Sequence, residues 1–193
     1  MGYSQEHINK TRRKILEEAG RLMRQRGYHG VSIGAIMEAA ELTHGGFYAH
    51  FDSKEQLFEA MAAEDFDFTN QVRRLLESDK FDRTNRAVFA AENYLDPSRT
   101  DKMWRACTMA ASSQDVSRAG ERAQEGFTER FRTLANAFSE AMGGRASKKR
   151  DAAALAALAT CIGGLTLAQA LTDDELSEAL LGACLDNVKS LAT

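Results

Sequence analysis

Residues 31–58 read VSIGAIMEAAELTHGGFYAHFDSKEQLF, and this stretch decides how the whole chain is interpreted. It predicts two short helices separated by a tight turn. Ser32 is a favoured N-cap residue for a first helix over residues 33–40, whose apolar side chains recur at helical spacing. A break at 41–42 then precedes a second, very short helix that begins at Thr43.

The flanking sequence adds a helix on each side of this pair. Residues 8–26 carry apolar residues at helical spacing and stop at Gly27, a residue favoured just after a helix. Ser53 to Gln56 has the form of a capping box and predicts a long helix from there to about residue 77. Three helices followed by a fourth, with a tight turn between the second and third, are typical of a helix-turn-helix DNA-binding domain.

The rest of the chain also predicts helices and no strand. Pro97 is the single proline, and 44% of the 193 residues are hydrophobic. The later helices are expected at 83–95, 101–114, 117–142, 147–171 and 174–191. The fold class is therefore all-α with about nine helices. The expected domains are a helix-turn-helix domain over 1–53 and a helical body over 54–193.

Composition excludes several classes of protein. No run of about 18 apolar residues predicts a membrane span, and the first residues lack a signal-peptide core, so a cytoplasmic location is expected. Cys107, Cys161 and Cys184 have no zinc-binding or disulfide spacing, so we expect no metal and no cofactor. The net charge is −3 overall, whereas residues 1–54 hold eight Lys and Arg against six Asp and Glu.

The third helix has the chemistry that a major groove requires. Gly45 and Gly46 have no side chains to hold the backbone away from base pairs, although each costs helix stability of about 1 kcal/mol relative to alanine. Thr43 and His44 occupy its leading end, where base edges are read. These four residues are the candidates for reading sequence.

Other residues are candidates for holding the DNA. Tyr48 offers a hydroxyl to a phosphate or a ring to a thymine methyl group, and Lys54 and Ser32 stand at helix N-termini that favour phosphate. Arg12, with its basic neighbours, would reach the flanking backbone. His50 is also a candidate. The alternatives stay open: the two histidines can be solvated polar residues and the first-helix arginines a solvated face, while Phe47 and Phe51 are expected in the core.

The stretch closely resembles the helix-turn-helix of TetR-family repressors. The resemblance rests on the aromatic pattern of Phe47, Tyr48, His50 and Phe51 and on the Ser53 capping segment that follows. It covers roughly residues 8–60; beyond them only helix number and order are similar. The resemblance implies a homodimer that binds a palindromic DNA operator and responds to a small-molecule effector.

The last two predicted helices are the candidates for a dimer interface. Residues 152–171 are rich in small residues, and the final helix has an apolar stripe. The resemblance implies that this pair meets its symmetry mates, with Ala156, Gly163, Leu167, Leu176, Leu180 and Val188 as interface residues. The same pattern fits helices buried within one chain, and periodicity does not separate the two.

The middle helices would form the ligand cavity, where the candidates are Tyr94, Trp104, Cys107, Met109, Phe127 and Phe131. The alternative is that these side chains belong to the core. Cys107 stands where relatives that respond to electrophiles carry a sensing cysteine, but Ala106 replaces the usual glycine before it. Cys107 is therefore either a reactive sensor or an inert buried thiol.

The function expected is that of a one-component transcriptional repressor released from DNA by a small molecule or by thiol modification. The rival is a helical enzyme or small-molecule carrier with no DNA role. No catalytic triad, paired catalytic carboxylates, phosphate loop or dinucleotide fingerprint is recognisable. All four histidines lie at or before residue 50, which leaves the body without the commonest catalytic base. A protein that only dimerises would not explain the two adjacent glycines.

Overall fold

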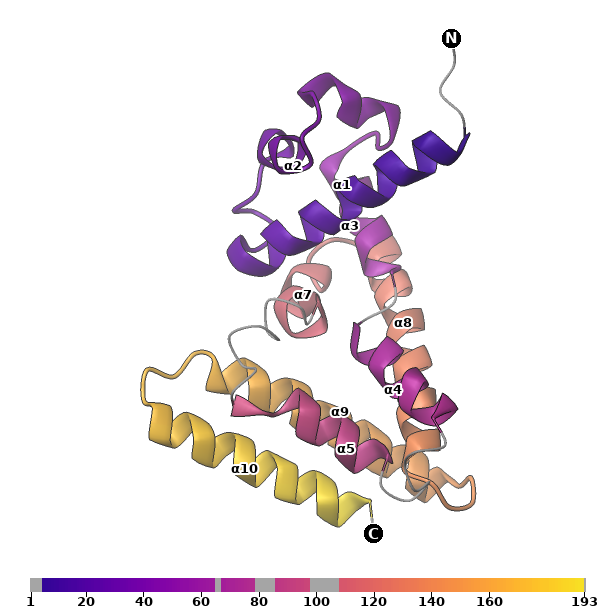
Figure 1. Ribbon diagram of the computed structural model, residues 1–193, viewed down its shortest axis with the longest axis vertical. Helices are drawn as coiled ribbons and strands as arrows, with labels where there is room; N and C mark the ends of the chain where they lie inside the picture. Colours follow the sequence, from indigo (N-terminus) through magenta and orange to yellow (C-terminus); the bar gives the residue numbers. More distant parts are fainter. Residues whose placement is uncertain (1–4, 65–66, 79–85, 98–107, 193) are drawn as a thin grey trace. The chain divides into compact units, whose positions relative to one another are not determined.

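The computed structural model describes residues 5–64, 67–78, 86–97 and 108–192 (Figure 1). Over these residues the all-α prediction is confirmed, because all regular structure in them is helical. The elements are α1 (Gln5–Arg26), α2 (Ile33–Ala39), the 3₁₀ helix η1 (His44–Ala49), α3 (Lys54–Ala62), α4 (Asp67–Glu77), α5 (Arg86–Tyr94), α7 (Thr108–Val116), α8 (Glu121–Ala141), α9 (Lys148–Ala168) and α10 (Asp174–Leu191).

The chain forms two compact units. Unit 1 comprises residues 1–64 and 111–128, and unit 2 comprises residues 65–110 and 129–193. Helix α8 contributes its first residues to unit 1 and the remainder to unit 2. Unit 1 is thus larger than the predicted DNA-binding domain over 1–53, whose functional boundary stays a prediction.

The core of unit 1 is built from the apolar faces of α1, α2, η1 and α3, completed by residues from α7 and α8. Its buried members are Ile15, Leu16, Ala19, Leu22, Met23, Val31, Ile36, Met37, Phe47, Phe51, Leu57, Phe58, Met61, Ala62, Val116 and Ala123. In α1 they recur every three or four residues, so one stripe of the helix faces the core. The core therefore combines side chains from the first 62 residues with two side chains, Val116 and Ala123, that lie more than 50 residues later.

The predicted helix from residue 54 to 77 is wrong in one respect, because it is two helices. Helix α3 ends at Ala62 and α4 begins at Asp67. No glycine or proline marks the break. The buried residues of α3 pack in unit 1, whereas Phe68 and Val72 of α4 are buried in unit 2. Helix α3 ends close to the point where the chain passes from unit 1 to unit 2. The spacing of apolar residues along the sequence does not reveal such a boundary.

Helices α9 and α10 form an antiparallel pair in unit 2, where α5 packs against α10 and α4 against α5 (Figure 1). The register of the pair is set by two hydrogen bonds. Asn187 Nδ2 donates to Thr160 Oγ1 at 3.0 Å, and Ser177 Oγ donates to the carbonyl oxygen of Ala168 at 3.2 Å. Asp173 caps α10, its side chain accepting a bond from the Leu176 N–H at 3.0 Å.

Helix α9 is long and apolar enough, by length and composition alone, to cross a membrane. This property was not predicted from the sequence. Core helices commonly pass the same test, and α9 buries Ala154, Leu158, Cys161 and Leu165 within unit 2. These buried side chains pack against helices of the same chain, whereas Leu155 and Leu167 of α9 remain exposed.

The close approach of α9 to α10 predicts a stability effect. A Cβ atom built at Gly164 would lie 2.5 Å from Cys184 Sγ and 3.2 Å from Cys184 Cβ. We expect Gly164→Ala to lower the free energy of unfolding by about 1–3 kcal/mol, because overpacking outweighs the better helix propensity of alanine. Urea denaturation measures the change.

The double variant Gly164→Ala/Cys184→Ala is the control for this prediction. Removing the sulfur opens space for the new methyl group, so part of the lost stability should return. Equal stability of Gly164→Ala and the unaltered protein would contradict the packing described for α9 and α10.

Candidate nucleic-acid interface

The turn between α2 and η1 is closed by backbone hydrogen bonds of the Schellman type. The Leu42 N–H donates to the Met37 carbonyl at 2.8 Å, and the Glu41 N–H donates to the Glu38 carbonyl at 2.9 Å. Glu41 has a φ of 56°, a left-handed conformation that usually selects glycine. Its carboxylate lies 3.1 Å from Lys14 Nζ of α1, although both groups are exposed. The turn orients η1 relative to α2.

Two phenylalanines anchor η1 to unit 1. Phe47 and Phe51 are buried, with ring centroids 5.7 Å apart, as the sequence predicts. The predicted third helix is present as a 3₁₀ helix of six residues, a form that proteins use in short segments. Because both phenylalanines point inward, the opposite face of η1 faces solvent.

The exposed face of η1 carries the residues predicted to read bases. Thr43, His44 and Gly45 are exposed, and the Tyr48 side chain is 57% exposed. The His44 and Tyr48 rings meet edge to face, with centroids 6.2 Å apart. Thr43 precedes η1 without capping it through its side chain, so its hydroxyl has no capping role. Thr43, His44 and Tyr48, which were named from the sequence, thus lie close together on the exposed face of η1.

The two adjacent glycines are not required by the fold of this chain. A Cβ atom at Gly45 would meet nothing within 4 Å, and one at Gly46 would make ordinary contacts with Thr43 and Met37. Neither glycine is among the described residues with positive φ. Glycine costs helix stability, and nothing in the unbound chain offsets that cost. A bare backbone at Gly45 is therefore suited to a partner outside the chain.

Ser32, Arg12 and His50 lie beside this face with different surroundings. The Ser32 hydroxyl caps α2 by accepting the Ala35 N–H at 3.1 Å. The Arg12 guanidinium lies 4.6 Å from the centroid of the Phe51 ring, so α1 brings a cation next to η1. His50 ends η1, and its buried Nδ1 has no hydrogen-bond partner in the described structure.

Lys54 makes contacts that the sequence analysis missed. Its ammonium group donates to the Tyr28 carbonyl and lies 4.2 Å from the centroid of the Tyr28 ring. The Tyr28 hydroxyl donates to Glu55 at 2.9 Å, and the Tyr28 N–H donates to Asp115 at 2.9 Å. Burial, followed by the bond to Glu55, raises the pKa of Tyr28 to about 12.

Tyr28, Lys54, Glu55 and Asp115 join the turn after α1 to α3 and α7 within unit 1. Burial lowers the pKa of Lys54, although Glu55 and Asp115 oppose the shift. Lys54 thus holds the start of α3 in place and keeps further N–H donors for a phosphate. Pairings over such sequence separations leave no local signal, which is why the sequence did not reveal them.

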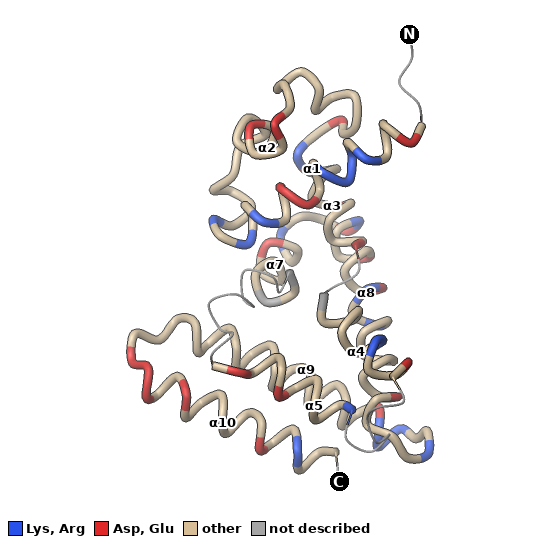
Figure 2. Tube along the Cα trace, viewed as in Figure 1, with Lys and Arg blue, Asp and Glu red and all other residues tan. Residues whose placement is uncertain are grey.

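Charge is distributed unevenly around η1. Figure 2 shows that η1 itself carries no acidic or basic residue, whereas α1 carries basic residues near its start. Lys10 and Arg13 are exposed there. Uncharged groups are thus placed where bases would be read, and cations are placed on the neighbouring helix, where phosphates would lie.

The predicted ligand-binding residues that the structure describes are divided between the two units. Tyr94 and Met109 are buried in unit 2. The centroid of the Tyr94 ring lies 4.4 Å from the centroid of the Phe68 ring. Phe127 packs against the core of unit 1, whereas Phe131 belongs to unit 2. The remaining two candidates, Trp104 and Cys107, lie outside the described residues. The burial of Tyr94 and Met109 fits either interpretation, so a ligand-binding role for the six residues stays a prediction.

The predicted dimer residues divide by exposure. Leu167 and Leu176 are 60% and 53% exposed, although leucine is usually buried. Ala156 is exposed, and Gly163 and Leu180 are partly so. Val188 is completely buried within unit 2, which corrects its placement in an interface between chains, because a covered side chain has no surface to offer. Over the described ranges, no group of three or more metal-ligating side chains occurs.

Comparisons with known proteins agree with this geometry. The sequence model of the family described as "Bacterial regulatory proteins, tetR family" matches residues 15–61. The HTH-type transcriptional repressor AcnR of Corynebacterium efficiens is 40% identical over 55 residues, which are 28% of this chain and 29% of that protein. The first curated relatives are matched over only 29–33% of their length.

Solved structures match the whole chain in fold. The reduced form of E. coli NemR has a TM-score of 0.78 at 22% identity and covers 94% of this chain and 96% of that one. A TetR transcriptional regulator from Legionella pneumophila has a TM-score of 0.77 at 17% identity, with 98% of each chain covered. These likenesses extend the resemblance from the N-terminal helices to the fold of the whole chain.

The environment of His50 predicts a pH dependence of stability. Burial, Arg12 and His7 lower the pKa of His50 from its usual value of 6.5. The folded state therefore binds a proton less readily than the unfolded chain, so stability present above pH 6.5 is lost as the pH falls below it. In urea denaturation at pH 7.5 and 5.5, His50→Gln should show a smaller acid-induced loss than the unaltered protein.

The matched control for this measurement is His44→Gln, which alters an exposed histidine on the same helix. It should retain the acid-induced loss of the unaltered protein. If His50→Gln and His44→Gln lost stability equally between the two pH values, the buried environment assigned to His50 would be wrong.

Proposed function

The chain belongs to the TetR family of bacterial regulatory proteins, and on that premise we propose that it is a transcriptional repressor that binds a DNA operator as a homodimer. A symmetric dimer presents two copies of η1 to half-sites about one helical turn or somewhat more apart. As a repressor of this kind it acts in the cytoplasm, on DNA, without an enzymatic step.

One observation carries the proposal: the exposed face of η1 keeps a glycine that its own fold does not need. Gly45 lies between His44 and the exposed Tyr48, and no described residue comes within 4 Å of a Cβ atom built at this position. A recognition helix must come within hydrogen-bonding reach of base edges in the major groove. A side chain at position 45 would separate the two surfaces, whereas a bare backbone lets His44 and Thr43 reach the bases.

Phosphate contacts supply the remaining affinity in this proposal. Arg12 packs on Phe51 next to η1, and Lys54 begins α3 with spare N–H donors. Ser32 caps α2 and is exposed. Contacts of this kind set the position of a protein on DNA without reading its sequence.

Gly45→Leu tests the proposal directly. A selected duplex is first obtained from random DNA by rounds of binding to the full chain. The leucine side chain should hold η1 away from the groove, and the loss of a few base contacts should weaken binding by about 10²–10³-fold. Fluorescence anisotropy measures the affinity, and thermal denaturation should show an unchanged fold because the position has open space.

Asn136→Leu is the matched control, because it places a leucine at an exposed position of α8, outside the proposed DNA-binding surface. It should bind the selected duplex like the unaltered protein. An equal affinity of Gly45→Leu and Asn136→Leu would overturn the assignment of η1 as the recognition helix, and failure to select any duplex would overturn the DNA-binding function.

The dimer is proposed on the exposed apolar side chains of α9 and α10. Figure 2 shows that α9 is uncharged along most of its length, and Leu167 and Leu176 remain exposed on this pair of helices. Leu155 of α9, which was not among the interface residues named from the sequence, is also exposed. Exposed leucines beside small residues fit a helix-to-helix interface between subunits.

Leu167→Glu should convert the dimer to a monomer. The new carboxylate would be buried without a partner in each subunit, and a cost of several kcal/mol per charge weakens association by at least about 10²-fold. Analytical ultracentrifugation measures the change. Asn136→Glu places the same charge at an exposed position of α8 and should leave the dimer intact. Identical sedimentation of the two variants would exclude this interface.

A small-molecule effector completes the proposed mechanism. It would bind the helical body with different affinities in the DNA-bound and released states, and that difference would shift the equilibrium between them. Release by modification of Cys107 remains a prediction from the sequence.

A further inference from the structure

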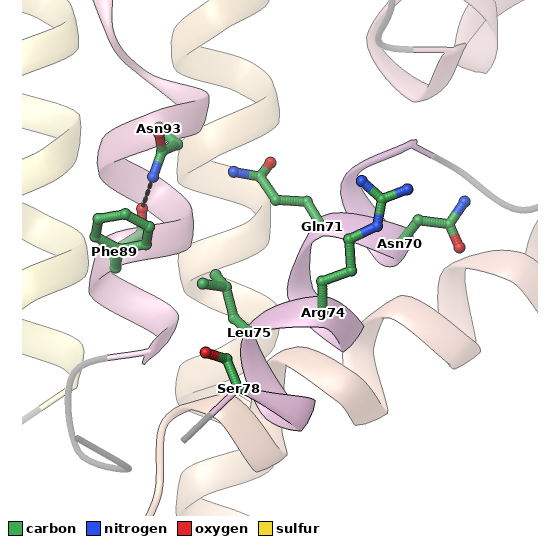
Figure 3. A pocket seen from close by; sticks show the side chains of 7 residues that line it. All are labelled: Asn70, Gln71, Arg74, Leu75, Ser78, Phe89 and Asn93. Atoms are coloured by element: carbon green, nitrogen blue, oxygen red, sulfur yellow. Dashed lines mark hydrogen bonds between the residues drawn. The ribbon is translucent and has the colours of Figure 1, made fainter. Parts of the chain in front are cut away.

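Unit 2 contains a cavity of about 440 Å³ between α4 and α5 (Figure 3). A volume of this size is within the range of about 300–1,000 Å³ that is typical of small-molecule sites. Asn70, Gln71, Arg74 and Leu75 line it from α4, and Phe89 and Asn93 line it from α5. The polar members of this set, Asn70, Gln71, Arg74 and Asn93, were not candidates from the sequence, where aromatic and sulfur-containing residues were considered instead.

The cavity combines one cation with carboxamides and apolar groups. No acidic residue is among the described residues that line it. Arg74 is exposed, and no carboxylate of the described residues forms an ion pair with its guanidinium group. A guanidinium presents paired N–H donors that match the two oxygens of a carboxylate. The charge in this cavity therefore favours an anion.

A second guanidinium group is bonded to the backbone of a residue that lines the cavity. Arg86 is only 8% exposed, and its Nη2 donates to the carbonyl oxygen of Ser78, another lining residue, at 2.7 Å. Its buried Nε has no hydrogen-bond partner in the described structure, and no carboxylate there pairs with it. A buried cation without a carboxylate partner among the described residues adds positive potential near Ser78.

The remaining lining residues favour a ligand that is polar at one end and apolar at the other. Leu75 and Phe89 supply apolar surface, while Asn70 and Gln71 supply amide donors and acceptors. The Asn93 amide donates to the Phe89 carbonyl at 2.9 Å, which holds this side chain against α5 (Figure 3). Charge and apolar surface thus lie within one site.

We propose that this cavity binds an amphipathic organic anion whose carboxylate pairs with Arg74 and whose apolar body lies against Leu75 and Phe89. This proposal rests on the proposed function in one respect only: the bound acid is also the effector that releases DNA. The binding itself does not depend on DNA and is measured separately.

Calorimetry on the full chain tests the binding with two probes that differ in charge. We expect 2-naphthoate to bind with one site per chain and the neutral 2-naphthamide to bind at least about tenfold more weakly, because a charge-assisted bond is lost. Arg74→Gln should remove this preference. Arg73→Gln takes the same charge from an exposed neighbour on α4 that does not line the cavity, and it should retain the preference.

Three results would overturn the binding site: no binding of 2-naphthoate at millimolar concentration, equal affinity for the two probes, or an unchanged preference in Arg74→Gln. In a second measurement, 2-naphthoate should release the selected duplex from the unaltered protein and not from Arg74→Gln. Binding without release would overturn the assignment as effector site. A chain that binds 2-naphthoate but no duplex would contradict the proposed function and leave the anion site standing.

Discussion

The burial of Phe47 and Phe51 is the constraint on which the DNA-binding surface depends. Both side chains are buried in unit 1, one near the middle of η1 and one just after it. A six-residue 3₁₀ helix with two glycines has little intrinsic stability, so tertiary packing must hold it. Because the two rings fix which side of η1 faces the core, they also fix which side carries His44 and Tyr48 outward.

Unit 1 is held together by contacts between distant parts of the sequence. Asp115 of α7 accepts the Tyr28 N–H, and Val116 and Ala123 complete a core made otherwise by the first 62 residues. Lys54 and Glu55 engage the carbonyl and the hydroxyl of the same tyrosine. The helix-turn-helix is thus stabilised by α7 and α8, and α8 continues along the chain into unit 2. An effector that shifts α8 would have a continuous helix through which to act.

Local signals explain what the sequence could predict. Caps, glycine stops and apolar periodicity identified α1, α2, α9 and α10 closely, and the aromatic pattern identified the exposed and buried sides of η1. The split after Ala62 and the left-handed Glu41 leave no such signal, because the first depends on a change of core and the second on a turn that normally selects glycine. The cavity was missed because Arg74 and Asn93 look like ordinary surface residues until two helices bring them together.

Photo-cross-linking from position 48 tests most directly whether η1 is the surface that reads DNA. Tyr48 is replaced by a photoreactive benzophenone amino acid, the chain is irradiated with the selected duplex, and the cross-linked bases are mapped. The account predicts adducts at two symmetry-related positions in the major groove, one for each subunit. Adducts obtained from a benzophenone that replaces Asn136 of α8, but not from position 48, would contradict it.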